Sequence, residues 1–280
     1  MSENKTGMSR RRVLLAGGGL VAGVGGAALA GCSAGESGGA GEESGGAARA
    51  TTGAATTAAG AGCYRLTAET TEGPYYIDAD KIRRDITEDR TGIPLTLKLT
   101  VIDSVSCKPL PNAAVDVWHC DALGLYSGYE SQSRGGGGGG GTAGISDSKR
   151  YLRGTQLTDK DGSVTFTTVF PGWYRGRCVH IHTKVHVGGT MTTSGYEGGR
   201  TVHTGQLFFA ESAVLDSAKV APYSTSTTER TTLDADTIYP GNGAEGGLLV
   251  LKYPKGKIAE GVVATLTMGV DPDETHTGTS

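Results

Sequence analysis

Seven short runs of β-forming residues between positions 94 and 270 constrain the fold of this chain more than any other feature. Each run holds five to ten residues, is rich in Val, Thr and Leu, and is bounded by turn residues such as Gly, Pro, Asp and Asn. Short strands separated by such turns are typical of antiparallel sandwiches. We therefore predict an all-β antiparallel sandwich with strands at 94–103, 113–119, 163–170, 179–187, 206–210, 247–253 and 262–270.

Helical signals are few. Residues 78–89 and 211–223 are the two candidate helices, and Pro222 ends the second. Seven consecutive glycines at 135–141 can form only a surface loop. We expect a few short helices and long loops around one sandwich.

The first 62 residues have the composition of a targeting segment and a tether. Three arginines at 10–12 precede a Gly-rich apolar stretch that ends at Cys32. This pattern predicts a twin-arginine lipoprotein signal over 1–31 and a lipid on Cys32. Residues 32–62 are almost wholly Gly, Ala, Ser and Thr, which predicts a flexible linker.

These segments define the expected organisation and location of the protein. The folded domain should span 63–271 and be followed by a disordered tail at 272–280. We expect export by the twin-arginine route to an extracytoplasmic location, where only the lipid on Cys32 ties the protein to the outer face of the cytoplasmic membrane.

Charge gives no sign of a nucleic-acid partner. The chain has a formal net charge of -3 at pH 7, and residues 1–31 hold four basic residues and one acidic residue, so their removal leaves about -6. A mildly acidic chain without basic clusters is not expected to bind nucleic acid.

The cysteines predict disulfides rather than a zinc site. Beside Cys32 the chain has Cys63, Cys107, Cys120 and Cys178, with no C-x-x-C pair. An even number in an exported chain favours two disulfides. Three pairings are open; we favour Cys107 with Cys120 because both flank one short strand.

The stretch RGRCVHIHTKV at 176–186 places two histidines one residue apart on a predicted strand. Alternate side chains of a strand point to the same face, so His180 and His182 can share one metal ion. The alternative is a polar strand face that binds nothing. His186 lies on the same face, but Lys184 separates it from the pair, and we assign it to the surface.

Tyrosines in Gly-rich turns are the nearest candidates for further ligands. Tyr126 lies in DALGLYSGY and Tyr174 in PGWYRGR. A phenolate is a hard oxygen donor that suits a hard ion such as iron(III), and a trivalent ion would favour loss of the phenol proton. The alternative is that both are turn or core aromatics.

Five motifs in a fixed order resemble those of the intradiol ring-cleavage dioxygenases. The resemblance covers about residues 63–270 and is nearest to the exported actinobacterial and fungal branch. It implies the β-sandwich of that family and a catechol cleaved with O2 between its two hydroxyl-bearing carbons. The motifs are TEGPYY (71–76), VDVWHCDALGLYS (115–127), LRGTQLTDKDGSVTFTTVFPGWY (152–174), RCVHIH (177–182) and GQLFF (205–209).

The resemblance also implies roles for individual residues. Tyr126, Tyr174, His180 and His182 would bind a non-haem iron(III), and Tyr174 would be displaced by the substrate. Arg177 matches the arginine that stabilises negative charge developing on the substrate ring. Substrate-lining positions would be Gly73, Pro74, Tyr75 and Gln206.

Two features depart from the family pattern, and two other functions stay open. Only five residues separate Tyr174 from His180, and Cys178 replaces a small polar residue. The sequence alone also allows a non-catalytic sandwich module that binds a cell-wall or plant polymer, or a copper or zinc site at the histidine pair. No flavin, haem or nicotinamide motif is present, and a homodimer stays open.

Overall fold

The computed structural model describes residues 68–78, 81–133, 144–241 and 246–276. Every described residue belongs to one unit of the chain, Thr57–Ser280. The predicted signal, the linker and the glycine run lie outside the described residues. Among the helices that the structure describes, none is long and apolar enough to cross a membrane.

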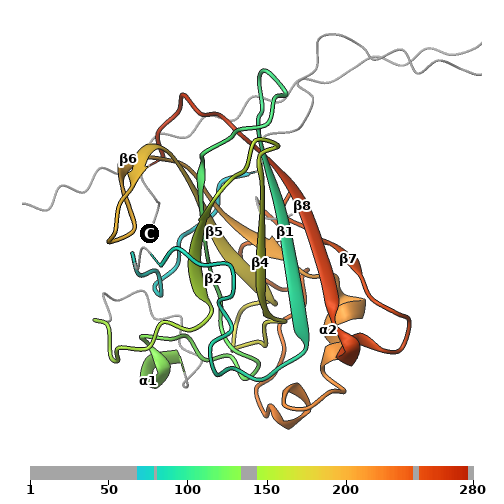
Figure 1. Ribbon diagram of the computed structural model, residues 1–280. Helices are drawn as coiled ribbons and strands as arrows, with labels where there is room; N and C mark the ends of the chain where they lie inside the picture. The colour runs from blue at the N-terminus through green and yellow to red at the C-terminus, as the bar shows by residue number, and fades with distance from the viewer. Residues whose placement is uncertain (1–67, 79–80, 134–143, 242–245, 277–280) are drawn as a thin grey trace, which may run out of the picture. The chain divides into compact units, whose positions relative to one another are not determined.

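In the described part of the chain, eight strands form two four-stranded sheets, which confirms the predicted all-β sandwich (Figure 1). The first sheet has the order β4-β1-β8-β7 and the second has the order β3-β2-β5-β6. Each pair of neighbours is antiparallel except β1 and β8, which run parallel. The strands are β1 (Pro94–Asp103), β2 (Ala114–Trp118), β3 (Arg153–Leu157), β4 (Ser163–Val169), β5 (His180–Met191), β6 (Tyr196–Phe208), β7 (Val250–Lys252) and β8 (Val262–Val270).

The hydrophobic core forms from the inward side chains of both sheets. In β1 every second residue is buried, at Leu95, Leu97, Leu99 and Val101. These belong to one cluster with Ile181 and other apolar residues of the second sheet. Since alternate strand residues face opposite ways, burying Ile181 in the core turns both of its histidine neighbours to the outer face of the second sheet.

The strand bounds follow the sequence best where apolar residues alternate. The predictions for β1 and β8 match at both ends. Strand β6 begins ten residues earlier than predicted, and β3 was missed because its sequence, RGTQL, is short and polar.

The predicted helix at 78–89 is wrong for the described part of that segment, residue 78 and residues 81–89. These residues form no helix: isolated bridges join Ile82 to Thr155 and Asp85 to Thr167, and a turn follows at 88–89. Backbone hydrogen bonds explain the difference, because Arg83 N donates to Thr155 O and Ile86 N donates to Thr167 O. The segment thus hydrogen-bonds to a strand of each sheet instead of to itself.

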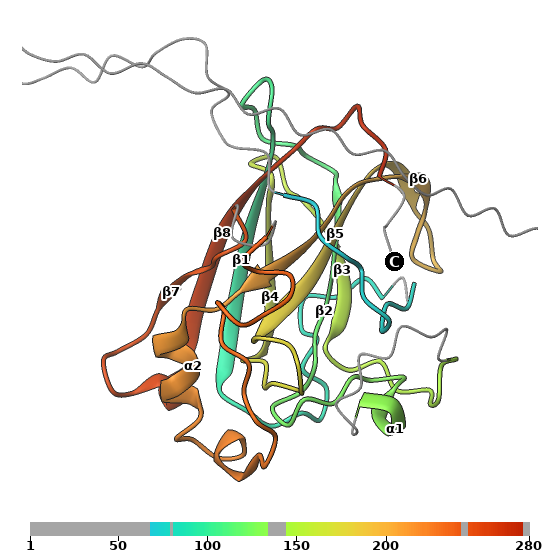
Figure 2. The ribbon, with the colours of Figure 1, turned by 180° about the vertical axis from the view of Figure 1, so that it is seen from behind.

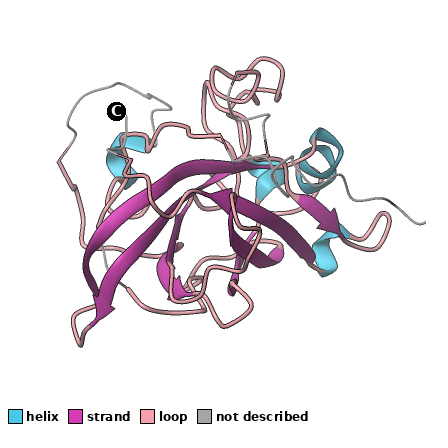
Figure 3. Cartoon of the chain, turned by 90° about the horizontal axis from the view of Figure 1, so that it is seen from above, coloured by secondary structure: helices cyan, strands magenta, loops and turns pink. Residues whose placement is uncertain are grey.

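Short helices lie at the periphery of the strands (Figure 3). Helix α1 (Glu130–Ser133) lies on the side of the second sheet, and α2 (Glu211–Ser217) lies by one end of β7 and β8 (Figure 2). The predicted helix at 211–223 ends six residues early and is followed by the 3-10 turn η1 (Tyr223–Thr225); a second such turn, η3 (Ile258–Glu260), precedes β8.

The start of the predicted disordered tail is held against β6. His276 N donates a hydrogen bond to Thr201 O at 2.8 Å, and the Arg200 guanidinium donates to Pro272 O. For residues 272–276 the prediction of disorder is therefore corrected, and 277–280 lie outside the described residues.

Candidate metal centre

The first three residues of β5 place the histidine pair on the outer face of the second sheet. His180 Nε2 and His182 Nε2 are 3.1 Å apart, and both residues are buried. His180 Nδ1 lies 2.7 Å from Cys178 O, so Nδ1 carries the proton and Nε2 presents its lone pair. Metal–imidazole bonds of about 2 Å place two such nitrogens at roughly this separation when they share an ion.

Two tyrosines from separate loops reach the same point. Tyr174 Oη lies 3.3 Å from His180 Nε2, and the Tyr126 ring lies 5.7 Å from the Tyr174 ring, centroid to centroid. The Tyr126 ring also meets the His182 ring at 6.2 Å. The structure therefore brings together all four residues that the family resemblance named as ligands.

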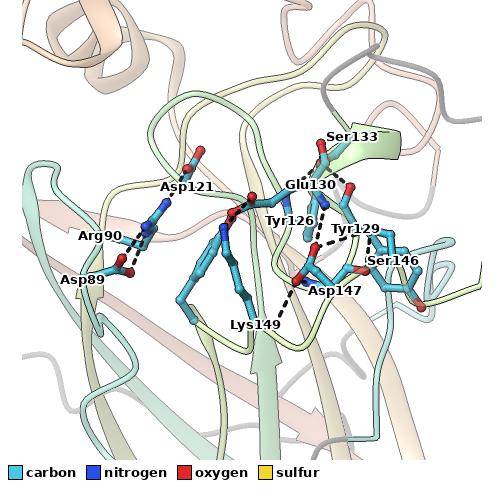
Figure 4. A network of polar contacts seen from close by, with 12 residues as sticks. Asp89, Arg90, Asp121, Tyr126, Tyr129, Glu130, Ser133, Ser146, Asp147 and Lys149 are labelled. Atoms are coloured by element: carbon cyan, nitrogen blue, oxygen red, sulfur yellow. Dashed lines mark hydrogen bonds and ion pairs between the residues drawn. The ribbon is translucent and has the colours of Figure 1, made fainter.

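The loop that carries Tyr126 is held by a polar network around α1 (Figure 4). Tyr126 N donates to Ser133 Oγ at 3.1 Å, and Ser133 Oγ donates to Tyr129 O at 2.8 Å. Asp147 accepts from Gly128 N, and Glu130 pairs with Lys149 at 2.7 Å. The backbone that presents the Tyr126 ring is thus fixed from both sides.

Asp121 holds the beginning of the same loop. Its Oδ1 accepts from Leu123 N and Leu125 N at 2.9 and 3.0 Å, and its Oδ2 lies 3.6 Å from Arg90 Nη1. Asp121 O also accepts from Gly172 N in the loop that carries Tyr174. The two tyrosine loops are therefore joined directly by their backbones.

Burial keeps all four groups uncharged when no ion is nearby. It raises the pKa of the Tyr126 phenol well above its ordinary value, with the neighbouring Tyr174 oxygen adding to the effect, and it raises that of Tyr174 also. Burial lowers the pKa of both His180 and His182. Neutral imidazoles are the form that binds metals.

The donor set fits a hard cation. The Tyr126 hydroxyl is completely buried without a hydrogen-bond partner of normal geometry, which is costly for a polar group unless something else binds it. Two phenol oxygens and two imidazole nitrogens are donors that iron(III) accepts. An ion at this point would give the Tyr126 oxygen its missing partner.

Aromatic rings pack against two of the four donors, His182 and Tyr126. The Trp118 ring stacks on that of His182 at 4.9 Å with an interplanar angle of 8°, and Tyr75 lies 4.7 Å from Tyr126. Gly73 has a φ of +73°, and a Cβ there would lie 3.1 Å from His182 Cε1, so only glycine suits this close approach. Trp118 was not predicted as a site residue. Strand alternation nevertheless places it on this face, because Val117 between it and Asp116 turns into the core.

Arg177 and Gln206 meet beside the donors, whereas Pro74 is the one predicted substrate-lining residue that is exposed, and His186, which was assigned to the surface, has a partner of its own. The Arg177 guanidinium donates to Gln206 Oε1, and Gln206 Nε2 donates to Thr71 O at 2.9 Å. His186 binds Thr201 Oγ1 through Nδ1 at 3.1 Å, so it has a partner away from the histidine pair.

Sequence reasoning did not identify Asp236. Its Oδ2 accepts from Arg177 Nε at 2.9 Å and from Cys178 N at 2.7 Å. No local pattern signals this contact, because 59 residues separate Asp236 from Arg177.

The predicted disulfide between Cys107 and Cys120 is wrong. Cys107 is disulfide-bonded, whereas Cys120 and Cys178 are buried free thiols. Two disulfides among the four cysteines are therefore also excluded. Cys120 Sγ instead lies 3.6 Å from Gly172 O, which fills the space between the two tyrosine loops with a small apolar group.

Known proteins with similar sequences and structures share one activity class. A family model described as Dioxygenase matches residues 71–213. An intradiol ring-cleavage dioxygenase from Tetranychus urticae is 31% identical, with a TM-score of 0.67 over 76% of this chain and 98% of that chain.

Curated relatives match over shorter stretches. Catechol 1,2-dioxygenase from Acinetobacter baylyi is 29% identical over 118 residues, which are 40% of this chain and 34% of the relative. Chlorocatechol 1,2-dioxygenase from Pseudomonas putida is 28% identical over 166 residues, 49% of this chain and 56% of the relative. The chain thus spans between about a third and somewhat over half of the length of these two relatives.

Proposed function

Because this chain belongs to the intradiol ring-cleavage dioxygenase family, we propose that it is an iron(III)-dependent enzyme that opens a catechol-type ring with O2. Cleavage between the two hydroxyl-bearing carbons would give a cis,cis-muconate-type product. The observation that carries this proposal is the convergence of Tyr126, Tyr174, His180 and His182 on one buried point.

The four donors would hold the ion, each from a fixed position. Iron(III) bound there would supply Lewis-acid activation of a bound catecholate toward O2. His180 is oriented by its hydrogen bond to Cys178 O, and His182 by stacking on Trp118.

Tyr174 would be the ligand that gives way to substrate. Tyr174 is 8% exposed, whereas Tyr126 is fully buried in a loop fixed by Ser133 and Asp121. A ligand at the edge of the site can turn away at lower cost than one enclosed on every side. The displaced Tyr174 oxygen would then hold one proton released by the catechol.

Arg177 would stabilise the negative charge that develops on the substrate ring. Its side chain is 14% exposed, and two of its nitrogens are already bound by Asp236 and Gln206. A guanidinium fixed in advance stabilises developing charge without having to reorganise during the reaction.

The proposal is tested by metal content, colour and oxygen uptake together. The purified protein should contain about one iron per chain, absorb visible light through tyrosinate-to-iron charge transfer, and consume O2 with a catechol. A panel including catechol, protocatechuate and hydroxyquinol, with products identified by mass, would give the substrate and separate intradiol from extradiol cleavage.

Two variants test the donor assignment directly. His180→Ala and His182→Ala should each lose iron and colour, since each removes one imidazole donor. Full iron occupancy in either variant would show that the pair does not bind the metal. A colourless wild-type protein that contains copper, zinc or no metal would instead support another metal site or a non-catalytic binding module.

We also propose an extracytoplasmic location, on the basis of the twin-arginine and Cys32 motifs. Both motifs lie outside the described residues, so the support is from sequence alone. Cell fractionation of the full chain and of Cys32→Ala would test it, since loss of the lipid should move the protein from the membrane to the soluble fraction.

A further inference from the structure

A buried carboxylate outside the family-matched segment connects Arg177 to the histidine ligands. Asp236 lies between η1 and β7, beyond residues 71–213, and its side chain is fully buried. Its Oδ1 accepts from Ile238 N at 2.7 Å and from Tyr239 N at 3.0 Å. Because both oxygens of Asp236 are in use, the carboxylate cannot turn without breaking hydrogen bonds.

The same carboxylate binds two groups in the residues that immediately precede β5. Oδ2 accepts from Arg177 Nε and from Cys178 N, while Cys178 O accepts from His180 Nδ1. Asp236 therefore fixes the guanidinium and also binds the backbone N–H of Cys178, the residue whose carbonyl orients His180. Burial alone would raise the pKa of Asp236, but the Arg177 charge and these hydrogen bonds lower it, so the group is a carboxylate.

Arg177 is held along one side only. Asp236 binds Nε and Gln206 binds Nη2, and Nη1 has no hydrogen-bond partner among the described residues. An unrestrained arginine has many rotamers, and fixing one of them costs side-chain entropy. A guanidinium that is already fixed can present its remaining N–H groups to a ligand without that cost.

We propose that Asp236 is a positioning residue that aims the Arg177 guanidinium at the substrate ring. This inference rests on the proposed function, since it assumes that Arg177 acts on a bound catechol. Asp236 would act through Arg177, so its loss should affect turnover more than metal binding or substrate affinity.

The primary test compares Asp236→Asn with Asp234→Asn in the full-length protein. Asp234 is an exposed carboxylate two residues away in the same segment, so it controls for a change of charge. Asp236→Asn should lower kcat about 100-fold, the scale of loss when a positioned group is displaced by about 1 Å. Iron content, the charge-transfer spectrum and KM should change little, and Asp234→Asn should match the wild type.

A double-mutant cycle separates positioning from general structural support. Arg177→Met removes the guanidinium, so adding Asp236→Asn to it should change kcat less than threefold if Asp236 acts through Arg177. Losses that multiply in the double variant would overturn the proposal. Unchanged kcat in Asp236→Asn would overturn it too, as would loss of iron in step with activity.

A second variant keeps the test decisive if Asp236→Asn does not fold. Asp236→Glu keeps a carboxylate for the backbone donors but moves it by one methylene, which should displace the guanidinium and lower kcat with iron retained. A folded Asp236→Glu with wild-type kcat would overturn the inference. A wild-type protein without iron or oxygen uptake would overturn the proposed function itself, whatever the Asp236 variants do.

Discussion

At the scale of single residues, the two tyrosines of the site differ in how firmly they are held. Tyr174→Phe removes only the hydroxyl at the more exposed position, so three donors remain. We expect this variant to retain most of its iron, with weaker charge-transfer absorption, but to lose most of its turnover because substrate can no longer exchange with a tyrosine oxygen. Elemental analysis and oxygen uptake measure both effects.

Tyr126→Phe is the matched comparison, since it deletes the same atom from the fully buried ring. It should lose more iron than Tyr174→Phe because Tyr126 would remain bound throughout the reaction. Wild-type turnover in Tyr174→Phe, or equal iron loss in the two variants, would contradict the assignment of the exchangeable ligand.

The placement of single residues was predictable only where local geometry decides it. The shared face of His180 and His182 follows from strand alternation, and the structure places their Nε2 atoms 3.1 Å apart. The role of Asp236 could not be predicted, because its contact with Arg177 depends on the path of the connection after η1. A buried Asp in a loop carries no sequence signal of its partner.

At the scale of elements, the site depends on close contact between the two tyrosine loops. Gly124 has a φ of +84°, and a Cβ there would overlap the Trp173 carbonyl oxygen and lie 3.3 Å from Tyr174 Cβ. Gly124→Ala should therefore separate the loops, lowering both the free energy of unfolding and the iron content. Urea denaturation and elemental analysis report the two quantities.

Gly176→Ala provides the control for backbone strain. Gly176 has a similar φ of +86° but open space around the added Cβ. A left-handed alanine should lower the free energy of unfolding by about 1–2 kcal/mol in both variants. Only Gly124→Ala should lower it further and lose iron. Equal destabilisation and equal iron content would show that contact between the loops does not control the site.

Elements were predictable from sequence where their hydrogen bonds stay within a regular strand. For example, the alternation of Leu95, Leu97 and Leu99 correctly predicts β1. The segment 81–89 has helix-like composition, but its backbone donors find acceptors on β3 and β4, and such tertiary pairing outweighs weak helix propensity.

At the scale of the whole molecule, the sandwich was predictable because many short strands without long helices have few other ways to bury their apolar faces. The sequence does not show which polar side chains form hydrogen bonds between the two sheets. His119 follows β2 of the second sheet and accepts through Nε2 from Thr168 Oγ1, on β4 of the first sheet, at 2.8 Å, while its Nδ1 donates to Cys120 O.

This buried imidazole should make folding stability depend on pH. Burial lowers the pKa of His119 from 6.5 to about 4, against a smaller opposite effect of its bond to Cys120 O. Between these values the unfolded chain binds a proton that the folded chain does not, so stability is present above pH 6.5 and is lost as pH falls toward 4. The shift corresponds to about 3 kcal/mol.

His119→Asn tests this contribution in iron-free protein, where metal binding adds no pH dependence of its own. The difference in unfolding free energy between wild type and variant should shrink by about 3 kcal/mol as the pH is lowered from 7 to 4. Burial also lowers the pKa of His186 and raises that of Asp116, but both residues are present in each protein, so their effects cancel in the difference.

Thr168→Val distinguishes the buried charge from the lost hydrogen bond. It removes the donor to His119 Nε2 but leaves the imidazole buried, so it should lower stability at neutral pH and keep the full pH dependence. If Thr168→Val flattens the pH profile as much as His119→Asn does, the hydrogen bond between the sheets, and not the cost of charging a buried histidine, controls the acid stability of the sandwich.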